Sequence, residues 1–511
     1  MQNNDKKVLL RISNLKQYFP LKGGRFVKAN DGISLDIYEG ETFGLVGESG
    51  CGKSTLGRTI LQLYHQTYGR TMYYGRSLDD LAPKYVIDTV KNLKARRTKL
   101  RELEQKRDKL EADYAKLSEK EQYAKHGELD TARKLAEDAL LDITKIVGGF
   151  LVVDDLDPVI AAYSKDYGIA RKISALEEKR QALQVDVDDA QYAKKTAEEA
   201  GKSEKSGQLE KAQEKLRQCD DQIAALRQQL DAGRQEIEAL RQPYASDPEF
   251  QKYEAYRDDG IDLARLEYNE MRRLRSDMQL IFQDPYSSLN PRMSVGQIIS
   301  EGMQAHNMIK KKDARMQQLV LNIMDECGLA PYFLHRFPHQ FSGGQRQRIG
   351  IARALATNPK FVVCDEAVSA LDVSIQAQII NLLLDLKEHQ NLTYMFITHD
   401  LSVVKYISDR VGVMYLGNMV ELAEADEIFH HPIHPYTEAL LNAIPTTDTV
   451  GAKELSILEG DIPSPVNPPK GCKFHTRCKY CTEICTQVVP AWEEVRPNHF
   501  VACHHKLEVK E

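Results

Sequence analysis

The sequence lacks three features that mark membrane-spanning, secreted and nucleic-acid-binding proteins. It has no apolar run of about 18 residues and no N-terminal signal peptide, so we expect a chain that neither crosses a membrane nor is secreted. It has no basic excess, because 69 lysines and arginines stand against 75 aspartates and glutamates, a net charge of −6. Nucleic-acid-binding proteins usually carry a basic excess, so we expect no nucleic-acid partner. If the protein acts at a membrane, other subunits must cross it.

Length and composition indicate a globular protein of several domains. The chain has 511 residues, of which 42% are hydrophobic and 28% charged. At about 150 residues a domain, this length suggests roughly three domains with an ample core. Changes in composition divide the chain into regions 1–82, 83–266, 267–425 and 426–511. The first and third have an α/β pattern, the second is rich in charged helix-forming residues, and the fourth ends in a cysteine-rich tail.

Region 83–266 carries heptad repeats on two separate arms. Apolar residues recur at Leu93, Leu100, Leu103, Leu110, Tyr114 and Leu117, and again at Leu209, Leu216, Ile223, Leu230 and Ile237. Two such arms predict one long antiparallel coiled-coil hairpin with a small tip near 147–168. The alternatives are a bundle folded onto the core and partial disorder caused by the many charges.

A glycine-rich loop carries the clearest chemistry. Residues 47–54 match G-x-x-x-x-G-K-[ST] in full, between a predicted buried strand at 42–46 and a predicted helix. Backbone N–H groups of such a loop bind phosphate oxygens, Lys53 reaches the β- and γ-phosphates, and the Ser54 hydroxyl coordinates Mg²⁺. The residues expected to bind ATP here are Gly47, Glu48, Ser49, Gly50, Cys51, Gly52, Lys53, Ser54 and Thr55.

A second half of the site is predicted far downstream. Residues 361–366 are a short apolar run that ends in two carboxylates, as expected of a buried parallel strand whose carboxyl end faces a ligand. Asp365 would hold Mg²⁺, and Glu366 would orient or deprotonate the attacking water. Alone this pattern is weak, but together with the glycine-rich loop it is strong.

Several further short motifs stand in one order along the chain, and with them the sequence resembles the nucleotide-binding subunit of an ATP-binding cassette (ABC) transporter. The resembling positions are Phe19 (or Tyr18) at the adenine ring, Gln283 in the Q-loop, Ser342, Gly343, Gly344 and Gln345 in the signature motif, Asp372 in the D-loop, and the switch residue His399. The resemblance covers about 1–82 and 267–505 and leaves out the helical insert.

The resemblance implies a fold and a mechanism. The fold would be an α/β P-loop NTPase ABC cassette with a RecA-like core, an antiparallel β subdomain and a helical signature subdomain, interrupted by the hairpin. Two cassettes would clamp two ATP molecules, so that the signature motif contacts ATP held by the partner. Glu366, His399 and Gln283 would be catalytic, with Mg²⁺ held through Ser54, Gln283 and Asp365.

Two segments narrow the resemblance to oligopeptide and dipeptide importer ATPases. These are residues 431–441, which begin His-Pro-Ile-His-Pro-Tyr, and residues 368–378. This implies an ATPase that powers peptide import with a second ATPase subunit, two permease subunits and an extracytoplasmic solute-binding protein. It would act at the cytoplasmic face of the membrane, with the hairpin free to bind a further protein. Nickel or another small solute remains an alternative cargo.

Two other functions compete with transport. Chromosome-structure and DNA-repair ATPases also join an ABC head to a coiled coil, but there the coil follows the Q-loop, whereas here it precedes Gln283. A docking or regulatory subunit with little turnover is disfavoured by the presence of Glu366. The chain departs from the family at Ala367, where members usually have proline. This change removes no chemical group, so we expect activity to survive.

The tail holds five of the nine cysteines. Clustered thiols in an intracellular chain more often bind metal than form disulfides. Cys472, Cys478, Cys485 and Cys503 also fit the pattern of related importer ATPases, some of which resemble iron–sulfur proteins there. They are expected to hold a [4Fe–4S] cluster or Zn²⁺, with reduced, packed thiols as the alternative and Cys481 outside the set.

Overall fold

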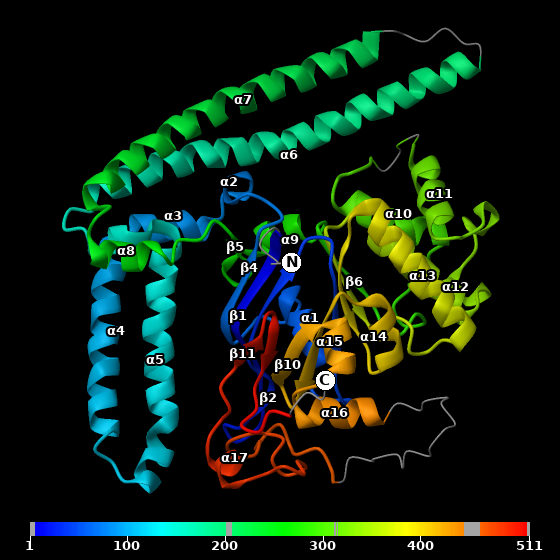
Figure 1. Ribbon diagram of the computed structural model, residues 1–511. Coiled ribbons are helices and arrows are strands. Elements are labelled where there is room, and N and C mark those ends of the chain that lie inside the picture. Colours follow the sequence, from blue (N-terminus) through cyan, green and yellow to red (C-terminus); the bar gives the residue numbers. More distant parts are fainter. Residues whose placement is uncertain (1–5, 201–206, 311–312, 314, 444–459, 508–511) are drawn as a thin grey trace. The chain divides into compact units, whose positions relative to one another are not determined.

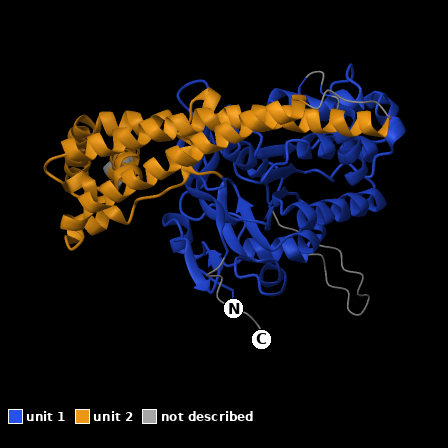
Figure 2. Cartoon of the chain, turned by 90° about the horizontal axis from the view of Figure 1, so that it is seen from above, with its two compact units in different colours: residues 1–75, 272–511 blue, residues 76–271 orange. Residues whose placement is uncertain are grey.

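The computed structural model describes residues 6–200, 207–310, 313, 315–443 and 460–507. The chain divides into two compact units, coloured separately in Figure 2. Unit 1 comprises Met1–Gly75 and Arg272–Glu511, and unit 2 comprises Arg76–Met271. Among the helices formed by the described residues, none is both long and apolar enough to cross a membrane.

The larger sheet of unit 1 sets the positions of the site. Its eight strands lie in the order β11-β12-β10-β9-β3-β8-β7-β6 (Figure 1). The pairs β9–β3, β3–β8, β8–β7 and β7–β6 are parallel, and the remaining pairs are antiparallel. The strands are β3 (Thr42–Val46), β6 (Met278–Ile281), β7 (Phe361–Asp365), β8 (Thr393–Ile397), β9 (Arg410–Tyr415), β10 (Asn418–Glu424), β11 (Glu493–Arg496) and β12 (His499–Val501). Strands β3, β7 and β8 are buried along their whole length, as expected of central parallel strands.

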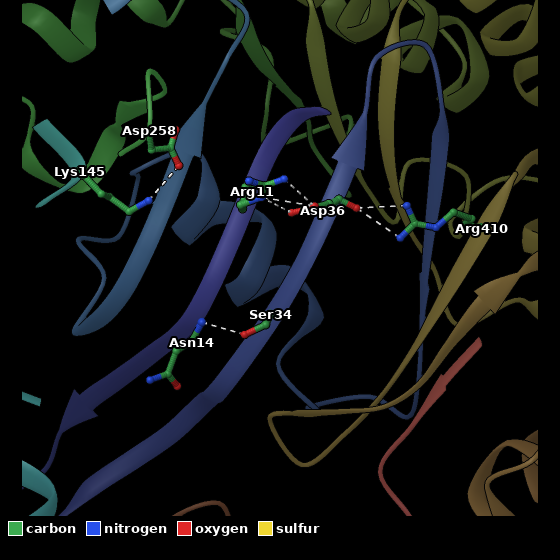
Figure 3. Close-up of polar contacts among 7 residues, drawn as sticks. All are labelled: Arg11, Asn14, Ser34, Asp36, Lys145, Asp258 and Arg410. Carbon is green, nitrogen blue, oxygen red and sulfur yellow. Dashed lines mark hydrogen bonds and ion pairs between the residues drawn. The ribbon is translucent and has the colours of Figure 1, made fainter. Parts of the chain in front are cut away.

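A smaller antiparallel sheet packs beside it within unit 1. Its strands in this unit have the order β2-β1-β4 and are β1 (Val8–Pro20), β2 (Phe26–Tyr38) and β4 (Tyr68–Tyr73). Asn14 N–H donates to the Ser34 hydroxyl at 2.9 Å, and Arg11 pairs with the Asp36 carboxylate at 3.0 Å (Figure 3). Arg410 on β9 donates two hydrogen bonds of 3.3 Å to the carbonyl of Asp36, which ties the two sheets together.

Helices cover the sheets of unit 1 and complete its core. They are α1 (Lys53–Ile60), α10 (Val295–Ala305), α11 (Met316–Glu326), α12 (Gly343–Leu355), α13 (Val373–Gln390), α14 (Leu401–Ile407), α15 (Ala425–His430), α16 (Pro435–Asn442) and α17 (Glu483–Gln487), with short 3₁₀ turns at Pro331–Phe333 and Pro338–Gln340. One apolar cluster joins α10, α12 and α13 to β6, β7 and β8. A second joins β9 and β10 to α15, α16 and Phe474 of the tail.

Unit 2 is almost entirely helical. Its elements are α2 (Leu78–Leu81), α3 (Lys84–Lys91), α4 (Leu93–Tyr114), α5 (Glu119–Val147), a 3₁₀ turn η1 (Gly148–Val152), α6 (Asp157–Glu199), α7 (Gly207–Arg241), η2 (Gln242–Tyr244), α8 (Pro248–Glu254), β5 (Ile261–Asp262) and η3 (Leu263–Arg265), and α9 (Tyr268–Leu274) crosses its boundary. Lys145 and Asp258 form a largely buried ion pair of 2.8 Å within this unit (Figure 3).

The prediction of one long hairpin with a tip at 147–168 is wrong, because unit 2 contains two hairpins. Helix α4 pairs with α5, and α6 pairs with α7 (Figure 1). The expected tip is instead a buried centre, in which Phe150 and Leu156 pack against residues of α4, α5, α6 and α8. Heptads show that a helix has an apolar face but not which helix that face contacts, so the two arms found in the sequence belong to different pairs.

Candidate ATP site

The phosphate loop connects β3 to α1 and requires glycine at both ends. Gly47 has φ 148°, and a Cβ there would lie 2.2 Å from the carbonyl oxygen of Met414. Gly52 has φ 104°, and a Cβ there would lie 2.1 Å from the carbonyl oxygen of Ala29. Only glycine tolerates these conformations and this close approach of the backbone. Gly52 leaves the N-terminus of α1 without a side-chain cap, so its N–H groups are available to an anion.

Lys53 is buried inside the curve of the loop. Its Nζ donates to the carbonyl oxygens of Gly47 at 2.7 Å and Glu48 at 3.0 Å. Burial raises the pKa of the neighbouring Cys51 thiol, which therefore stays neutral and packs as a small apolar side chain. The ammonium group of Lys53 thus lies within the loop, held by two of the loop's own carbonyl groups.

Asp365 and Ser54 meet although 311 positions separate them. The Ser54 hydroxyl donates to Asp365 Oδ1 at 2.6 Å, and Arg58 Nη2 lies 3.1 Å from Oδ2. Asp365 is 1% exposed and is the last residue of β7. A hydroxyl and a carboxylate are hard oxygen ligands of the kind that Mg²⁺ prefers, so this pair fits the ion.

Two further side chains meet at Glu366. Gln283 Nε2 donates to Glu366 Oε2 at 2.6 Å, and His399 Nδ1 lies 3.5 Å from Oε1. Glu366 has φ 49°, uncommon for a residue with a side chain, and its N–H donates to the carbonyl of Ile397 at 2.9 Å. The backbone therefore turns sharply after β7 and presents the carboxylate between Gln283 and His399.

The topology explains why these distant residues converge. Gly47 follows β3, Gln283 follows β6, Glu366 follows β7 and His399 follows β8. These four strands are parallel neighbours in the order β3-β8-β7-β6, so their carboxyl ends share one edge of the sheet. Ligands of open α/β sheets bind at this edge.

The sequence matches the family model of the ABC transporter over residues 30–251 and 254–369. It also matches the model of the oligopeptide/dipeptide transporter C-terminal region over residues 420–485. The chain belongs to the ABC transporter ATP-binding family. Together with the geometry above, this membership makes it an ABC-type ATPase, as the motifs predict.

Curated relatives place this ABC ATPase near oligopeptide transport ATP-binding proteins. It is 52% identical to AppF of Bacillus subtilis over 250 residues, which are 48% of this chain and 75% of AppF. It is 35% identical over 507 residues, or 98% of each chain, to YkfD of Bacillus subtilis, a protein provisionally named as an oligopeptide transport ATP-binding protein. It is 52% identical to OppF of Salmonella typhimurium over 247 residues, which are 48% of this chain and 73% of OppF.

The remaining predicted ATP-site residues lie on other surfaces of the ABC ATPase. Ser342 is exposed and caps α12, where its hydroxyl and the side chain of Gln345 bond each other's backbone N–H groups. Asp372 is exposed at the start of α13. Among the described residues, no hydrogen bond or ion pair joins either residue to Lys53 or Glu366. Phe19 on β1 is half-buried, and its ring meets that of Tyr64 edge-on at 5.3 Å.

The cysteine tail gives no support to the predicted metal centre. Burial and, to a smaller extent, neighbouring thiols raise the pKa of Cys472 to about 11 and that of Cys503 to about 12. Cys472 N–H donates to the Cys485 carbonyl at 2.8 Å. Over the part of the chain that the structure describes, no three histidine, cysteine or carboxylate groups are arranged to hold a metal ion.

Some residues that contact the site belong to none of the sequence motifs. Arg58 pairs with Asp365. It lies four residues, or one helical turn, after Ser54, and this spacing is the sequence signal that could have indicated it. Asn30 Nδ2 donates to the carbonyl of Gly52 at 3.0 Å, and no local pattern announces it. Tyr436 and Arg477 contact the phosphate loop from the C-terminal region, although neither belongs to an ATP-binding motif.

Proposed function

We propose that this ABC ATPase powers the import of peptides by closing on ATP against a second ATPase subunit. The observation that carries the proposal is the convergence of Lys53, the Ser54–Asp365 pair and the Gln283–Glu366–His399 group at one sheet edge. The cargo class rests on the relatives AppF and OppF, which are named as oligopeptide transport ATP-binding proteins.

At the phosphate loop, the phosphates of ATP replace two backbone carbonyls as the hydrogen-bond partners of Lys53. Lys53 moves its ammonium group from the carbonyls of Gly47 and Glu48 to the β- and γ-phosphates, while the loop N–H groups and the N-terminus of α1 receive phosphate oxygens. Phe19, half-buried on β1, offers a ring face for adenine. Bound Mg²⁺ would neutralise charge that develops on the phosphates, and Ser54 and Asp365 are the residues that would hold it.

At the sheet edge, Glu366 orients and deprotonates the attacking water. Its carboxylate is held from one side by Gln283 and from the other by His399, so it can receive a proton without changing its position. Gln283, which is exposed, senses the γ-phosphate through the same contact.

A partner ATPase completes the site. The exposed Ser342 and the following turns of α12 present backbone donors to ATP that the partner holds, and Asp372 lies at the same interface. ATP then joins the two subunits and hydrolysis releases them, which is a ligand-driven shift between two states.

Permease subunits dock next to the Q-loop. Residues Phe282 and Tyr286 flank Gln283 and are exposed, with Arg353 and Arg346 over their rings. A cavity of about 620 Å³ lies near α10 and α11, lined among others by Met293, Gln297, Glu301, Gln304, Met316 and Val320. A mixed apolar and polar hollow of this kind suits one amphipathic helix of a membrane subunit. The ATPase would then act at the cytoplasmic face of the membrane, with a solute-binding protein on the other side and unit 2 as a partner-binding arm.

The first test addresses ATP binding. The Lys53→Ala variant should lose Mg·ATP binding in isothermal titration while keeping the parent's circular dichroism spectrum. Lys405→Ala, a change of an exposed lysine on α14, should bind ATP as the parent does. Retention of full affinity by Lys53→Ala would refute the ATP site.

The second test addresses the cargo. The ATPase is assembled with its permeases in vesicles, and ATP-dependent accumulation of an oligopeptide mixture is compared with that of Ni²⁺. Peptide accumulation that Glu366→Gln abolishes supports the proposal. Uptake of Ni²⁺ without peptide would favour the small-solute alternative.

A further inference from the structure

Glu48, the second residue of the phosphate loop, is held at every polar group it has. Its carboxylate receives two hydrogen bonds from Arg477, with Nη1–Oε2 at 2.7 Å and Nη2–Oε1 at 3.0 Å. Its N–H donates to the hydroxyl oxygen of Tyr436 at 2.9 Å. Its carbonyl receives hydrogen bonds from Lys53 Nζ at 3.0 Å and from Cys51 N–H at 3.2 Å. The contacts to its carboxylate and to its N–H come from the C-terminal region, about 430 and 390 positions away in sequence.

The two C-terminal residues are themselves firmly supported. Tyr436 is fully buried, and its ring contacts those of Tyr415 and Phe474, with centroids 4.8 and 5.2 Å away. The side chain of Arg477 is 5% exposed, and the backbone N–H of Arg477 donates to the Phe474 carbonyl at 3.0 Å. Bonding to Glu48 raises the pKa of Arg477, which is therefore charged throughout the working range. A buried, bidentate, charge-assisted contact of this kind is both strong and specific in geometry.

A purely structural role would be to fasten the C-terminal region to the rest of unit 1. That fastening exists elsewhere, because Lys473 Nζ lies 3.2 Å from both the Asp31 carboxylate and the Leu416 carbonyl. The apolar cluster around Phe474 adds to it. The Glu48 contacts differ from these, since they end on the one loop whose shape decides phosphate binding.

We infer that Tyr436 and Arg477 are positioning residues that hold Glu48, and with it the first half of the phosphate loop, in its ATP-binding shape. The inference rests on the proposed ATP site. When Lys53 turns from the carbonyls of Gly47 and Glu48 to the phosphates, the loop loses these two bonds and keeps the 3.2 Å bond from Cys51 N–H to the Glu48 carbonyl. The contacts from Tyr436 and Arg477 remain, so the loop N–H groups stay in place and binding does not have to order them.

The experiment measures Mg·ATP affinity, KM and kcat on the full chain. Arg477→Gln removes the charged fork and should raise the Kd and KM for ATP about tenfold, because a charged hydrogen-bonded pair is lost. Tyr436→Phe removes one oxygen while keeping the ring packing, and should raise them about threefold. The kcat at saturating ATP should change less than twofold in both. Lys479→Gln, which breaks the 2.9 Å ion pair to Glu438 in the same region, is the matched control and should leave all three constants unchanged.

A double-mutant cycle separates positioning from general support. Glu48→Gln with Arg477→Gln should bind ATP no more weakly than Arg477→Gln alone, because both changes break one contact. Additive losses, or an unchanged Kd in Arg477→Gln and Tyr436→Phe, would overturn the inference. If Arg477→Gln does not fold, Tyr436→Phe and Glu48→Gln decide the question in the same way. Failure of Lys53→Ala to lose ATP binding refutes the ATP site itself. Normal binding by Arg477→Gln and Tyr436→Phe alone refutes only the positioning role.

Discussion

Units 1 and 2 fix their charged side chains in opposite ways. In unit 1 the charged groups of the site are mostly buried and contact residues up to 429 positions away, as with Arg477 and Glu48. In unit 2 many ion pairs join exposed side chains of neighbouring helices, such as Arg180 with Asp220 and Lys165 with Glu236, both at 2.6 Å. Exposed pairs contribute roughly 0–1 kcal/mol each to stability, whereas breaking a buried contact leaves a buried polar group without a partner. We therefore expect polar changes to matter in unit 1 and apolar changes to matter in unit 2.

The largest effect should come from Glu366→Gln, which tests the polar side of this comparison. The amide keeps the size of the side chain but cannot accept the proton of the attacking water. We expect kcat to fall by about 10²–10⁴-fold with Mg·ATP affinity retained. Glu388→Gln, the same change at an exposed position of α13, should leave steady-state hydrolysis unchanged. Turnover at the parent rate in Glu366→Gln would reject this carboxylate as the base.

Phe150→Ala tests the apolar side, at the centre of unit 2. Phe150 is buried, meets Phe250 edge-on at 5.8 Å and lies 4.6 Å under the guanidinium of Arg241. Its removal should lower the free energy of unfolding of unit 2 by about 3–5 kcal/mol. Amide hydrogen exchange in α5 and α8 reports this directly, because the single tryptophan, Trp492, belongs to unit 1.

The control for this change is Leu135→Ala, which removes a partly exposed leucine from α5. It should cost less than about 1 kcal/mol. Equal exchange rates in the two variants would mean that residues 148–156 do not form the centre of the unit.

The same comparison explains what could be predicted from sequence. The phosphate loop and the Asp365–Glu366 strand end are local patterns, and parallel strands bring such ends to one edge whatever lies between them. The convergence of Ser54, Gln283 and Glu366 was therefore predictable without knowing the insert. The family prediction is confirmed by the matches to both family models.

Contacts chosen by tertiary packing could not be predicted. Leu93–Leu117 and Leu209–Ile237 look like two arms of one coil, because a heptad records an apolar face and not its partner. Phe150 and Leu156 lie in an apolar run that also suits a small exposed tip. Arg477 lies in the cysteine-rich tail, and no motif in the sequence around it indicates a bond to the phosphate loop.

A smaller effect is expected from pH, through His434. Burial lowers the pKa of His434 to about 4, and its Nδ1 accepts a hydrogen bond from Tyr436 N–H at 3.0 Å. In the unfolded chain the pKa is about 6.5, so between these values the unfolded state binds more protons. The contribution of His434 to the stability of unit 1 should be constant above about pH 6.5 and fall by up to roughly 3 kcal/mol as the pH drops to about 4.

His434→Asn isolates this contribution. Asparagine can still accept the bond at the N-terminus of α16 but does not titrate. Denaturant unfolding followed by Trp492 fluorescence at pH 7 and 4.5 should show a smaller loss of stability in the variant than in the parent. Parallel pH profiles would assign the acid sensitivity to groups other than His434.

The smallest effect on ATP affinity should come from the largest change in the chain, replacement of Arg76–Met271 by a flexible Gly-Ser linker. The partners described for Lys53, Ser54 and Glu366 all belong to unit 1, so none of them is removed. We expect Mg·ATP affinity within about twofold of the parent, because a charged helical unit supplies no group to the phosphate loop. A folded variant that has lost ATP binding would contradict the independence of the two units, since the loop would then depend on unit 2 for its shape. Retained ATP binding with lost capture of a protein partner would instead locate the function of unit 2 in recognition.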